Sequence, residues 1–255
     1  MNSALEYIKY MWNAKGRHGI HSPYVYDFLD NCRSIKLNDS FRISLKNLYK
    51  TIRNSTKIIT IEDFGVGSKK MNKQRKVSNL LKTSSSKGKF GTLLYQLAKH
   101  YKFQNSLELG TSIGIGSIHL AKGNPLGKVS TVEACSATRT VALTNFDEMN
   151  CTNIDSINST FVDFFKTYSG DKFDLVYIDG HHDGAALLNY LQAVEPFSHD
   201  ETIYLLDDIR WSDSMFNAWN QLKADDRFHV SIDFFRMGML VKRTHQRKEN
   251  FIVKL

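Results

Sequence analysis

The chain has 255 residues, enough for one α/β domain of ordinary size together with an extension. Its net charge of +8 is unevenly spread, because residues 1–90 carry 18 Lys and Arg residues against 6 Asp and Glu residues. Three scattered cysteines without metal-ligand spacing, and the lack of any apolar run of about 18 residues, exclude a disulfide framework, a cysteine-zinc module and a membrane-spanning protein. The sequence therefore predicts a soluble, cytoplasmic protein with no membrane partner.

Residues 1–55 predict three short helices, because apolar residues recur at helical spacing in three successive segments. Between the first two helices lies a loop rich in histidine and glycine, residues 16–23. Two interpretations of this loop stay open: Ser22 caps a helix that Pro23 opens, or His18 or His21 reaches a substrate pocket. The apolar positions of the three helices are Leu5, Ile8, Tyr10 and Met11; Tyr24, Phe28 and Leu29; and Phe41, Leu45, Leu48 and Ile52.

A basic segment follows an expected strand at residues 57–63. Residues 69–89 hold eight basic side chains and no acidic one. Together with the three consecutive serines at 84–86, this composition predicts a mobile segment over residues 69–87. Such a run suits nucleic acid or an acidic substrate, and the alternative is a solvated loop.

Residues 106–117, SLELGTSIGIGS, predict a short strand that ends in a glycine-rich turn and continues into a helix. Gly110, Gly114 and Gly116 permit backbone conformations and close approaches that a β-carbon would forbid. The first turn of the helix offers unpaired N–H groups to a polar ligand. A ligand site is therefore expected here, preceded by a helix with Phe90, Leu93, Leu94 and Leu97 on one face.

The next strand, residues 128–133, ends in Glu133. A carboxylate at the end of a second strand can accept hydrogen bonds from both ribose hydroxyls of a nucleoside. The glycine pattern here is GxxxGxG, whereas a dinucleotide fingerprint is GxGxxG. The spacing therefore favours a nucleoside ligand other than a dinucleotide.

The rest of the chain alternates strands with helices. This rhythm predicts a doubly wound, mainly parallel sheet, and the last two strands form a β-hairpin at residues 229–242. The expected strands are residues 155–159, 173–179 and 202–208, and the expected helices are residues 138–149, 185–194 and 214–222.

The motifs ELGTSIGIGS and VSTVEA resemble those of the class I S-adenosylmethionine-dependent methyltransferases, over roughly residues 88–255. The resemblance implies a Rossmann-like α/β fold, with a doubly wound, mainly parallel seven-stranded sheet whose last strand is antiparallel. It divides the chain into a helical, basic N-terminal extension at residues 1–88, with a mobile loop near 69–87, and a methyltransferase domain at residues 89–255. The residues it implies for the cofactor are Glu108, Gly110, Thr111, Ser112, Gly114, Gly116, Glu133, Asp163 and Asp179.

Three acids beyond the later strands resemble the cation site of catechol-type O-methyltransferases. That family has one acid after the fourth strand and an Asp-Asn pair after the fifth, where this chain has Asp179 and the pair Asp207 and Asp208. The resemblance implies a divalent cation, Mg²⁺, Ca²⁺ or Mn²⁺, bound by these carboxylates. His182 stands where the family has a lysine, and imidazole also takes a proton near neutral pH, so the implied catalytic residues are Asp179, His182 and Asp207. The alternative is that Asp207 and Asp208 cap the next helix and pair with Arg210.

Methylation of a hydroxyl or carboxyl group on a small-molecule acceptor is the leading function, since no motif for amino-group or pyrimidine-carbon methylation is present. A nucleic-acid methyltransferase that uses the basic extension, and a cofactor-binding protein without catalysis, are the alternatives. The extension is expected to cap the active site, with residues 69–87 as its mobile part.

Overall fold

The computed structural model describes residues 3–16, 20–62, 73–84 and 86–255. The chain forms two compact units, Asn31–Tyr168 and Met1–Asp30 together with Ser169–Leu255. We call them unit 2 and unit 1, respectively. These boundaries differ from the division at residue 88 that the sequence suggests, and that division stays a prediction.

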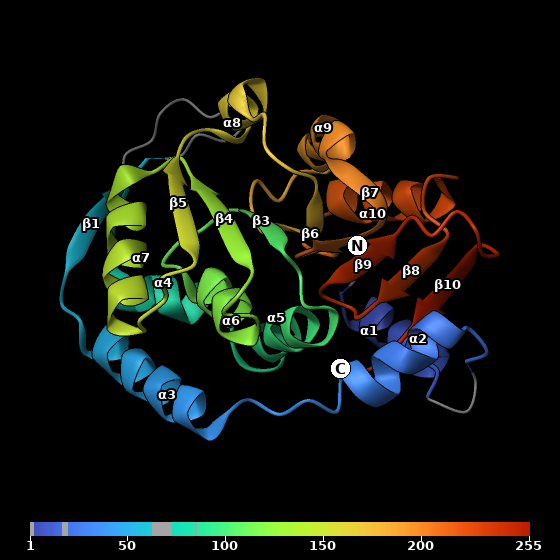
Figure 1. Cartoon of the computed structure of the whole chain (residues 1–255), viewed down its shortest axis with the longest axis horizontal. Helices are drawn as coiled ribbons and strands as arrows, with labels where there is room; N and C mark the ends of the chain where they lie inside the picture. The colour runs from blue at the N-terminus through green and yellow to red at the C-terminus, as the bar shows by residue number, and fades with distance from the viewer. Residues whose placement is uncertain (1–2, 17–19, 63–72, 85) are drawn as a thin grey trace. The chain divides into compact units, whose positions relative to one another are not determined.

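Unit 2 contains three parallel strands of the α/β sheet, in the order β3-β4-β5, and a separate antiparallel pair, β1 and β2. Figure 1 shows β3, β4 and β5 side by side, in green to yellow. The strands are β1 (Ile58–Ile61), β2 (Lys73–Lys76), β3 (Asn105–Leu109), β4 (Lys128–Glu133) and β5 (Ile154–Asn158). The helices are α3 (Asp39–Asn54), α4 (Val77–Thr83), α5 (Gly88–Tyr101), α6 (Ile115–Gly123), α7 (Ser136–Glu148) and α8 (Phe161–Thr167).

The apolar stripe of α3 explains why this helix belongs to unit 2. Its four buried positions recur at helical spacing, and they join one apolar core with residues of α4, α5, α6 and α7. Asn38 caps the helix, because its side chain accepts a hydrogen bond from the Ser40 amide at 2.9 Å. The stripe consists of Phe41, Leu45, Leu48 and Ile52.

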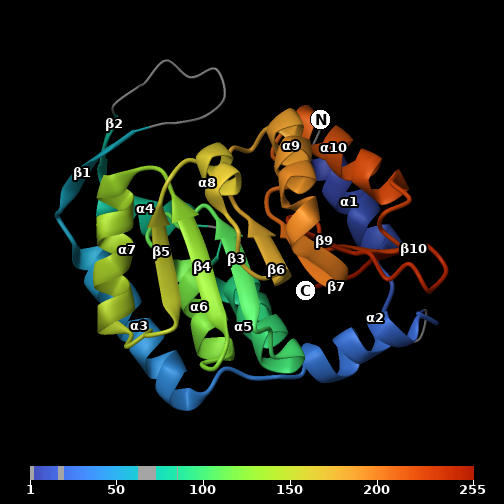
Figure 2. The ribbon, with the colours of Figure 1, turned by 45° about the horizontal axis from the view of Figure 1, so that its top comes forward.

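Unit 1 contains the other five strands, in the order β10-β8-β9-β7-β6. β6 and β7 are parallel, β9 is antiparallel to both β7 and β8, and β10 is parallel to β8. Helices α9 and α10 lie next to each other, as Figure 2 shows. The strands are β6 (Phe173–Ile178), β7 (Ser198–Leu206), β8 (Val230–Asp233), β9 (Gly238–Val241) and β10 (Glu249–Ile252). The helices are α1 (Ser3–Asn13), α2 (Pro23–Asp27), which continues as a π-helix (Phe28–Cys32), α9 (Gly184–Val194), the short 3-10 helix Glu195–Phe197 and α10 (Asp213–Ala224).

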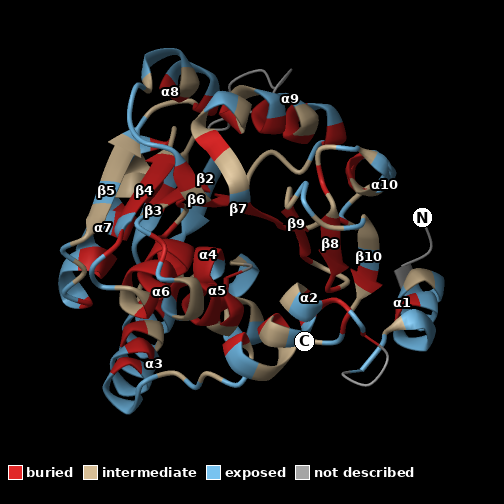
Figure 3. Ribbon diagram, turned by 45° about the vertical axis from the view of Figure 1, so that its right-hand side comes forward, coloured by how far each residue is buried: buried red, intermediate tan, exposed pale blue. Residues whose placement is uncertain are grey.

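Most positions of these strands are buried, and Figure 3 marks them in red. In unit 2 this holds for β3 and β4, whereas β1 has one buried position, β5 has none, and the four residues of β2 are all exposed. Among the helices in the described ranges, none has both the length and the hydropathy that crossing a bilayer requires.

The predicted doubly wound α/β fold with an antiparallel late strand is confirmed, as are the three N-terminal helices and the hairpin. Within the described residues the α/β strands number eight rather than seven, because β10 adds to the edge of β8. Pro23 opens α2 as expected, but Ser22 makes no capping hydrogen bond, and its hydroxyl is buried without a partner in the described part of the chain. His21 is exposed, whereas His18 lies outside the described residues.

Part of the segment predicted to be mobile has regular structure. Residues 73–76 pair with β1, and residues 77–83 form α4. The composition misleads here because Val77, Leu80 and Leu81 supply three buried side chains to the core of unit 2. Residues 69–72 and 85 lie outside the described residues.

Candidate functional site

The loop between β3 and α6 has a backbone that ordinary side chains rarely adopt. Gly110 and Gly114 have φ values of 107° and 82°, and Ser112 between them has a φ of 48°. A β-carbon on Gly114 would lie 2.4 Å from the ring of Phe146 on α7. Asn145, also on α7, donates a hydrogen bond to the Ile113 carbonyl at 2.8 Å. Helix α7 therefore fixes the shape of this loop.

Glu133 at the end of β4 is tied to the same loop. One carboxylate oxygen accepts the Ser112 amide at 2.9 Å, and the other accepts the Cys135 amide at 2.9 Å. Burial raises the pKa of Glu133, and the hydrogen bonds from the surrounding amides oppose that shift. Each carboxylate oxygen has a further lone pair, so both can still accept a ligand hydroxyl.

Glu108 lies beneath the loop with only 1% of its surface exposed. Its carboxylate accepts hydrogen bonds from the Ser117 hydroxyl and, at 2.6 Å, from the Thr131 hydroxyl. Thr131 is also 2.6 Å from the Thr111 hydroxyl, so a chain of hydrogen bonds joins β3, β4 and α6. Burial raises the pKa of Glu108 to about 7. The observed contacts of Glu108 hold the loop, and its contact with a cofactor stays a prediction.

Two other predicted cofactor residues have different surroundings. Gly116 is buried in the first turn of α6. Asp163 is exposed in the first turn of α8, where its carboxylate accepts hydrogen bonds from Thr160 and Lys166 at 2.8 Å each. These hydrogen bonds lower the pKa of Asp163. The contact of Asp163 with an adenine stays a prediction.

Unit 1 carries the other predicted site residues. Asp207 and Asp208 follow β7, and neither caps α10, whose N-cap is Ser212. Arg210 does not pair with them either, since it forms two hydrogen bonds with Asp233 at 2.8 and 2.7 Å. The alternative interpretation of the two acids is therefore wrong.

Arg236, a residue that sequence reasoning missed, is the partner of both acids. Its Nε lies 3.2 Å from Oδ1 of Asp207 and 3.0 Å from Oδ1 of Asp208. Burial and the nearby Asp207 raise the pKa of Asp208, while Arg236 opposes the shift. The second oxygen of Asp208 is 3.6 Å from Nδ1 of His182.

His182 and Asp179 lie on the loop after β6. The imidazole ring of His182 packs beside the exposed ring of Trp211, with centroids 5.3 Å apart. Asp179 accepts a hydrogen bond from the Tyr177 hydroxyl at 3.0 Å. Arg236, Tyr177 and Trp211 gave no sequence signal, because no motif includes them.

The three acids do not form a ready set of metal ligands. Across the described residues, the group of His, Cys, Asp or Glu side chains whose ligand atoms lie within 4.8 Å of one another is Asp200, Glu201 and His245. A cation at Asp179, Asp207 and Asp208 would also have to displace Arg236. The residues present thus do not fit the predicted cation.

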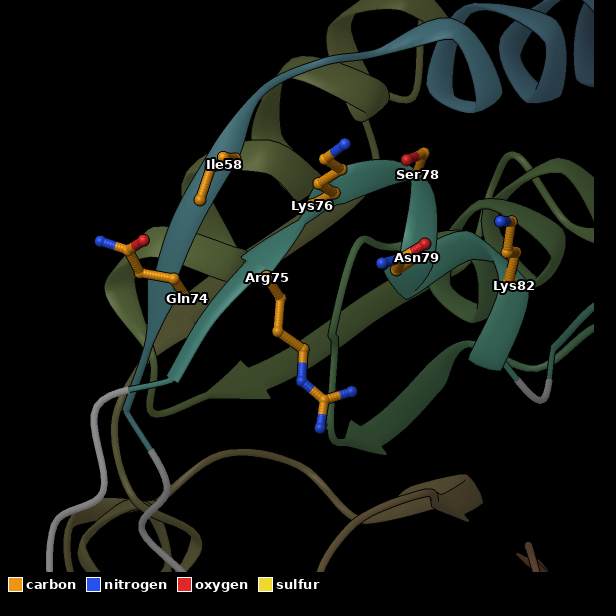
Figure 4. A pocket seen from close by; sticks show the side chains of 7 residues that line it. All are labelled: Ile58, Gln74, Arg75, Lys76, Ser78, Asn79 and Lys82. Carbon is orange, nitrogen blue, oxygen red and sulfur yellow. The ribbon is translucent and has the colours of Figure 1, made fainter.

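A surface pocket of about 670 Å³ lies elsewhere in unit 2, against β2 and α4. Figure 4 shows its side chains, among which Arg75, Lys76 and Lys82 are basic and none is acidic. The remaining lining residues are Ile58, Gln74, Ser78 and Asn79.

The strand order, the left-handed glycine loop and the carboxylate at the end of β4 together define the class I methyltransferase fold. Residues 107–209 match the family model described as a methyltransferase domain. Residues 107–209 of the chain therefore carry a methyltransferase domain, which confirms the methyltransferase resemblance found in the sequence.

Solved structures agree with this fold. Cofactor-bound Rv0187 from MTB has 19% identity and a TM-score of 0.54, and the match covers 88% of this chain and 98% of that one. The O-methyltransferase from Bacillus cereus in complex with SAH has 18% identity and a TM-score of 0.54, with coverage of 86% and 96%. A putative caffeoyl-CoA O-methyltransferase from Staphylococcus aureus has 14% identity and a TM-score of 0.57, with coverage of 65% and 88%. Among curated proteins, none matches this chain.

Proposed function

We propose that this chain transfers the methyl group of S-adenosylmethionine to an oxygen atom, in a hydroxyl or carboxyl group, of a small-molecule acceptor. The observation that carries the proposal is the position of Glu133, whose two carboxylate oxygens are held by the Ser112 and Cys135 amides beside the glycine loop. A fixed carboxylate at the end of this strand can accept hydrogen bonds from two vicinal ribose hydroxyls.

Donor binding belongs to the loop and strand ends of unit 2. Glu133 would accept hydrogen bonds from the ribose hydroxyls, and the left-handed loop at Gly110, Ser112 and Gly114 would present its backbone to the methionine part. Asp163 would accept a hydrogen bond from the adenine amino group. When bound, S-adenosylmethionine supplies an electrophilic methyl group on a sulfonium. The protein has to hold the acceptor oxygen in line with that group and receive the proton that the acceptor loses.

Acceptor chemistry belongs to Asp179, His182 and Asp207 of unit 1. Imidazole is the side chain among them whose ordinary pKa lies near neutrality, so His182 suits the role of general base. Its Nδ1 faces Asp208 at 3.6 Å, an arrangement that stabilises the imidazolium formed when the acceptor proton is taken.

Calorimetry tests the donor, and a product assay tests the transfer. The chain should bind S-adenosylmethionine or its demethylated product more tightly than NAD, and it should release S-adenosylhomocysteine when it is supplied with an active compound from a panel of hydroxyl and carboxyl acceptors. Tighter binding of NAD would overturn the proposal. Donor binding without release of S-adenosylhomocysteine with any acceptor would favour a cofactor-binding protein without catalysis.

The basic pocket favours a second candidate function, methylation of a nucleic acid. Lys76 and Lys82 line it, and both side chains are exposed. If RNA binds there, Lys82→Ala should weaken its affinity and reduce the slope of log K against log salt by about one for each phosphate that is no longer neutralised. Lys50→Ala, on an exposed position of α3, is the matched control. Equal effects of the two substitutions would count against this candidate.

A further inference from the structure

Arg236 occupies the place at which the catechol-type resemblance implies a divalent cation. A single nitrogen, Nε, lies within 3.2 Å of Asp207 and 3.0 Å of Asp208. The side chain of Asp207 is fully buried, and that of Asp208 is 13% exposed. A guanidinium is always charged at ordinary pH, so the two carboxylates have a permanent counter-charge.

The backbone around Arg236 is fixed by contacts with the loop that carries the acids. The Ile209 amide donates to the Arg236 carbonyl at 2.9 Å. Arg210 donates to the Phe235 carbonyl at 2.7 Å and is paired with the buried Asp233. These two hydrogen bonds join the loop after β7 to the turn between β8 and β9, next to the ion pairs of Arg236. The guanidinium is a built-in part of this site rather than a loose surface charge.

Asp207 offers one atom that these contacts leave without a partner. Its Oδ1 faces Arg236, but its Oδ2 is buried and accepts no hydrogen bond within the described residues. A buried carboxylate oxygen without a donor is costly, and its charge is already offset by Arg236. Arg236 is thus the one partner of this carboxylate among the described side chains.

We propose that the guanidinium of Arg236 is the built-in cation of the acidic site. It acts as a positioning residue that holds Asp207 and Asp208 in place of a divalent metal. That the site serves methyl transfer rests on the proposed function, whereas the exclusion of a metal rests on the ion pairs alone.

Manganese binding to the full-length chain, followed by the electron paramagnetic resonance of free Mn²⁺, tests the exclusion. Wild type and Asp207→Asn should bind Mn²⁺ equally, because Asp207 is committed to Arg236. Arg236→Gln should bind Mn²⁺ at a new site, about tenfold or more tighter than any Mn²⁺ binding by wild type. The double variant Arg236→Gln with Asp207→Asn should lose this site. Arg236→Lys keeps the charge and should gain none.

Arg227→Gln is the matched control, because Arg227 is 40% exposed, compared with 33% for Arg236, and pairs with Asp225 and Glu195 away from this cluster. It should create no site that depends on Asp207. Two outcomes would overturn the proposal: Mn²⁺ binding by wild type that Asp207→Asn weakens about tenfold or more, or no gained site in folded Arg236→Gln. The comparison of wild type with Asp207→Asn does not need the Arg236→Gln variant, so it tests the proposal even if Arg236→Gln fails to fold.

Activity supplies a second readout once an acceptor is found. Methyl transfer by wild type should survive exhaustive EDTA, and Arg236→Lys should retain more activity than Arg236→Gln. Loss of activity with EDTA that Mn²⁺ restores would also overturn the proposal. Calorimetry with S-adenosylmethionine on the same preparations distinguishes a failure of the proposed function from a failure of the proposal for Arg236. Failure to bind the donor would refute the proposed function and would leave the Mn²⁺ result unaffected.

Discussion

At the scale of single residues, Glu133 is the side chain on which donor binding should depend most. Glu133→Ala removes the acceptor for the ribose hydroxyls and also frees the Ser112 and Cys135 amides. S-adenosylmethionine should bind about 1 to 3 kcal/mol more weakly, as calorimetry would measure. Glu148→Ala, on an exposed position at the end of α7, is the control and should bind as wild type does. Equal affinities of all three proteins would refute the role of Glu133.

Glu108 and His119 give the protein opposite responses to pH. Burial raises the pKa of Glu108 from 4.5 to about 7, and burial lowers the pKa of His119 from 6.5 to about 4. The stability from Glu108 is therefore fully present below its unfolded pKa and is lost as the pH rises through 7. The stability from His119 is present above its unfolded pKa and is lost as the pH falls through 4. Between these limits the two contributions largely cancel.

Glu108→Gln should separate the two contributions. The variant lacks the carboxyl that stabilises the fold at low pH. We compare the free energy of unfolding of the variant with that of wild type at each pH. Relative to wild type, the variant should be less stable at about pH 5 than at about pH 8, by roughly 2 to 3 kcal/mol. Urea denaturation at the two pH values measures the difference. A constant difference would mean that Glu108 titrates alike in the folded and unfolded chains.

At the scale of elements, the strand-loop-helix unit from β3 to α6 depends on Gly114. Alanine at this position would need a positive φ, and its methyl group would meet the Phe146 ring at 2.4 Å. Gly114→Ala should destabilise the fold by about 2 to 4 kcal/mol and weaken donor binding, as thermal denaturation and calorimetry would measure. Gly16→Ala is the matched control, because nothing lies within 4 Å of the place that its methyl group would take. A stability like that of wild type in Gly114→Ala would show that the loop has room to adapt.

At the scale of the whole molecule, the proposed assignment of donor binding to unit 2 predicts where a bound donor slows hydrogen exchange. S-adenosylmethionine should protect backbone amides at residues 110–117 and 133–138 of unit 2, because a ligand that binds the folded state suppresses local opening around its site. Mass spectrometry of exchanged peptides measures the protection, with NAD as the control ligand. Protection confined to residues 169–255 would contradict the assignment of donor binding to unit 2.

The sequence by itself determined the features that depend on neighbouring residues. The strand, glycine turn and helix at residues 106–117, the acid at the end of β4 and the alternation of strands with helices were all predictable, because periodicity and glycine spacing are local properties. The methyltransferase class followed from these same features and is confirmed.

Only the tertiary structure decided which polar side chains meet. Arg236 reaches Asp207 across 29 positions of the chain, and Asn145 reaches the Ile113 carbonyl across 32. Strand β10 and helix α4 were missed for the same reason, since each is stabilised by a distant partner rather than by its own composition. The sequence placed three acids beyond the strands and implied a metal, but only the structure shows that Arg236, in the turn between β8 and β9, pairs with two of them. Pairing of this kind depends on how the chain folds back on itself, which no local pattern encodes.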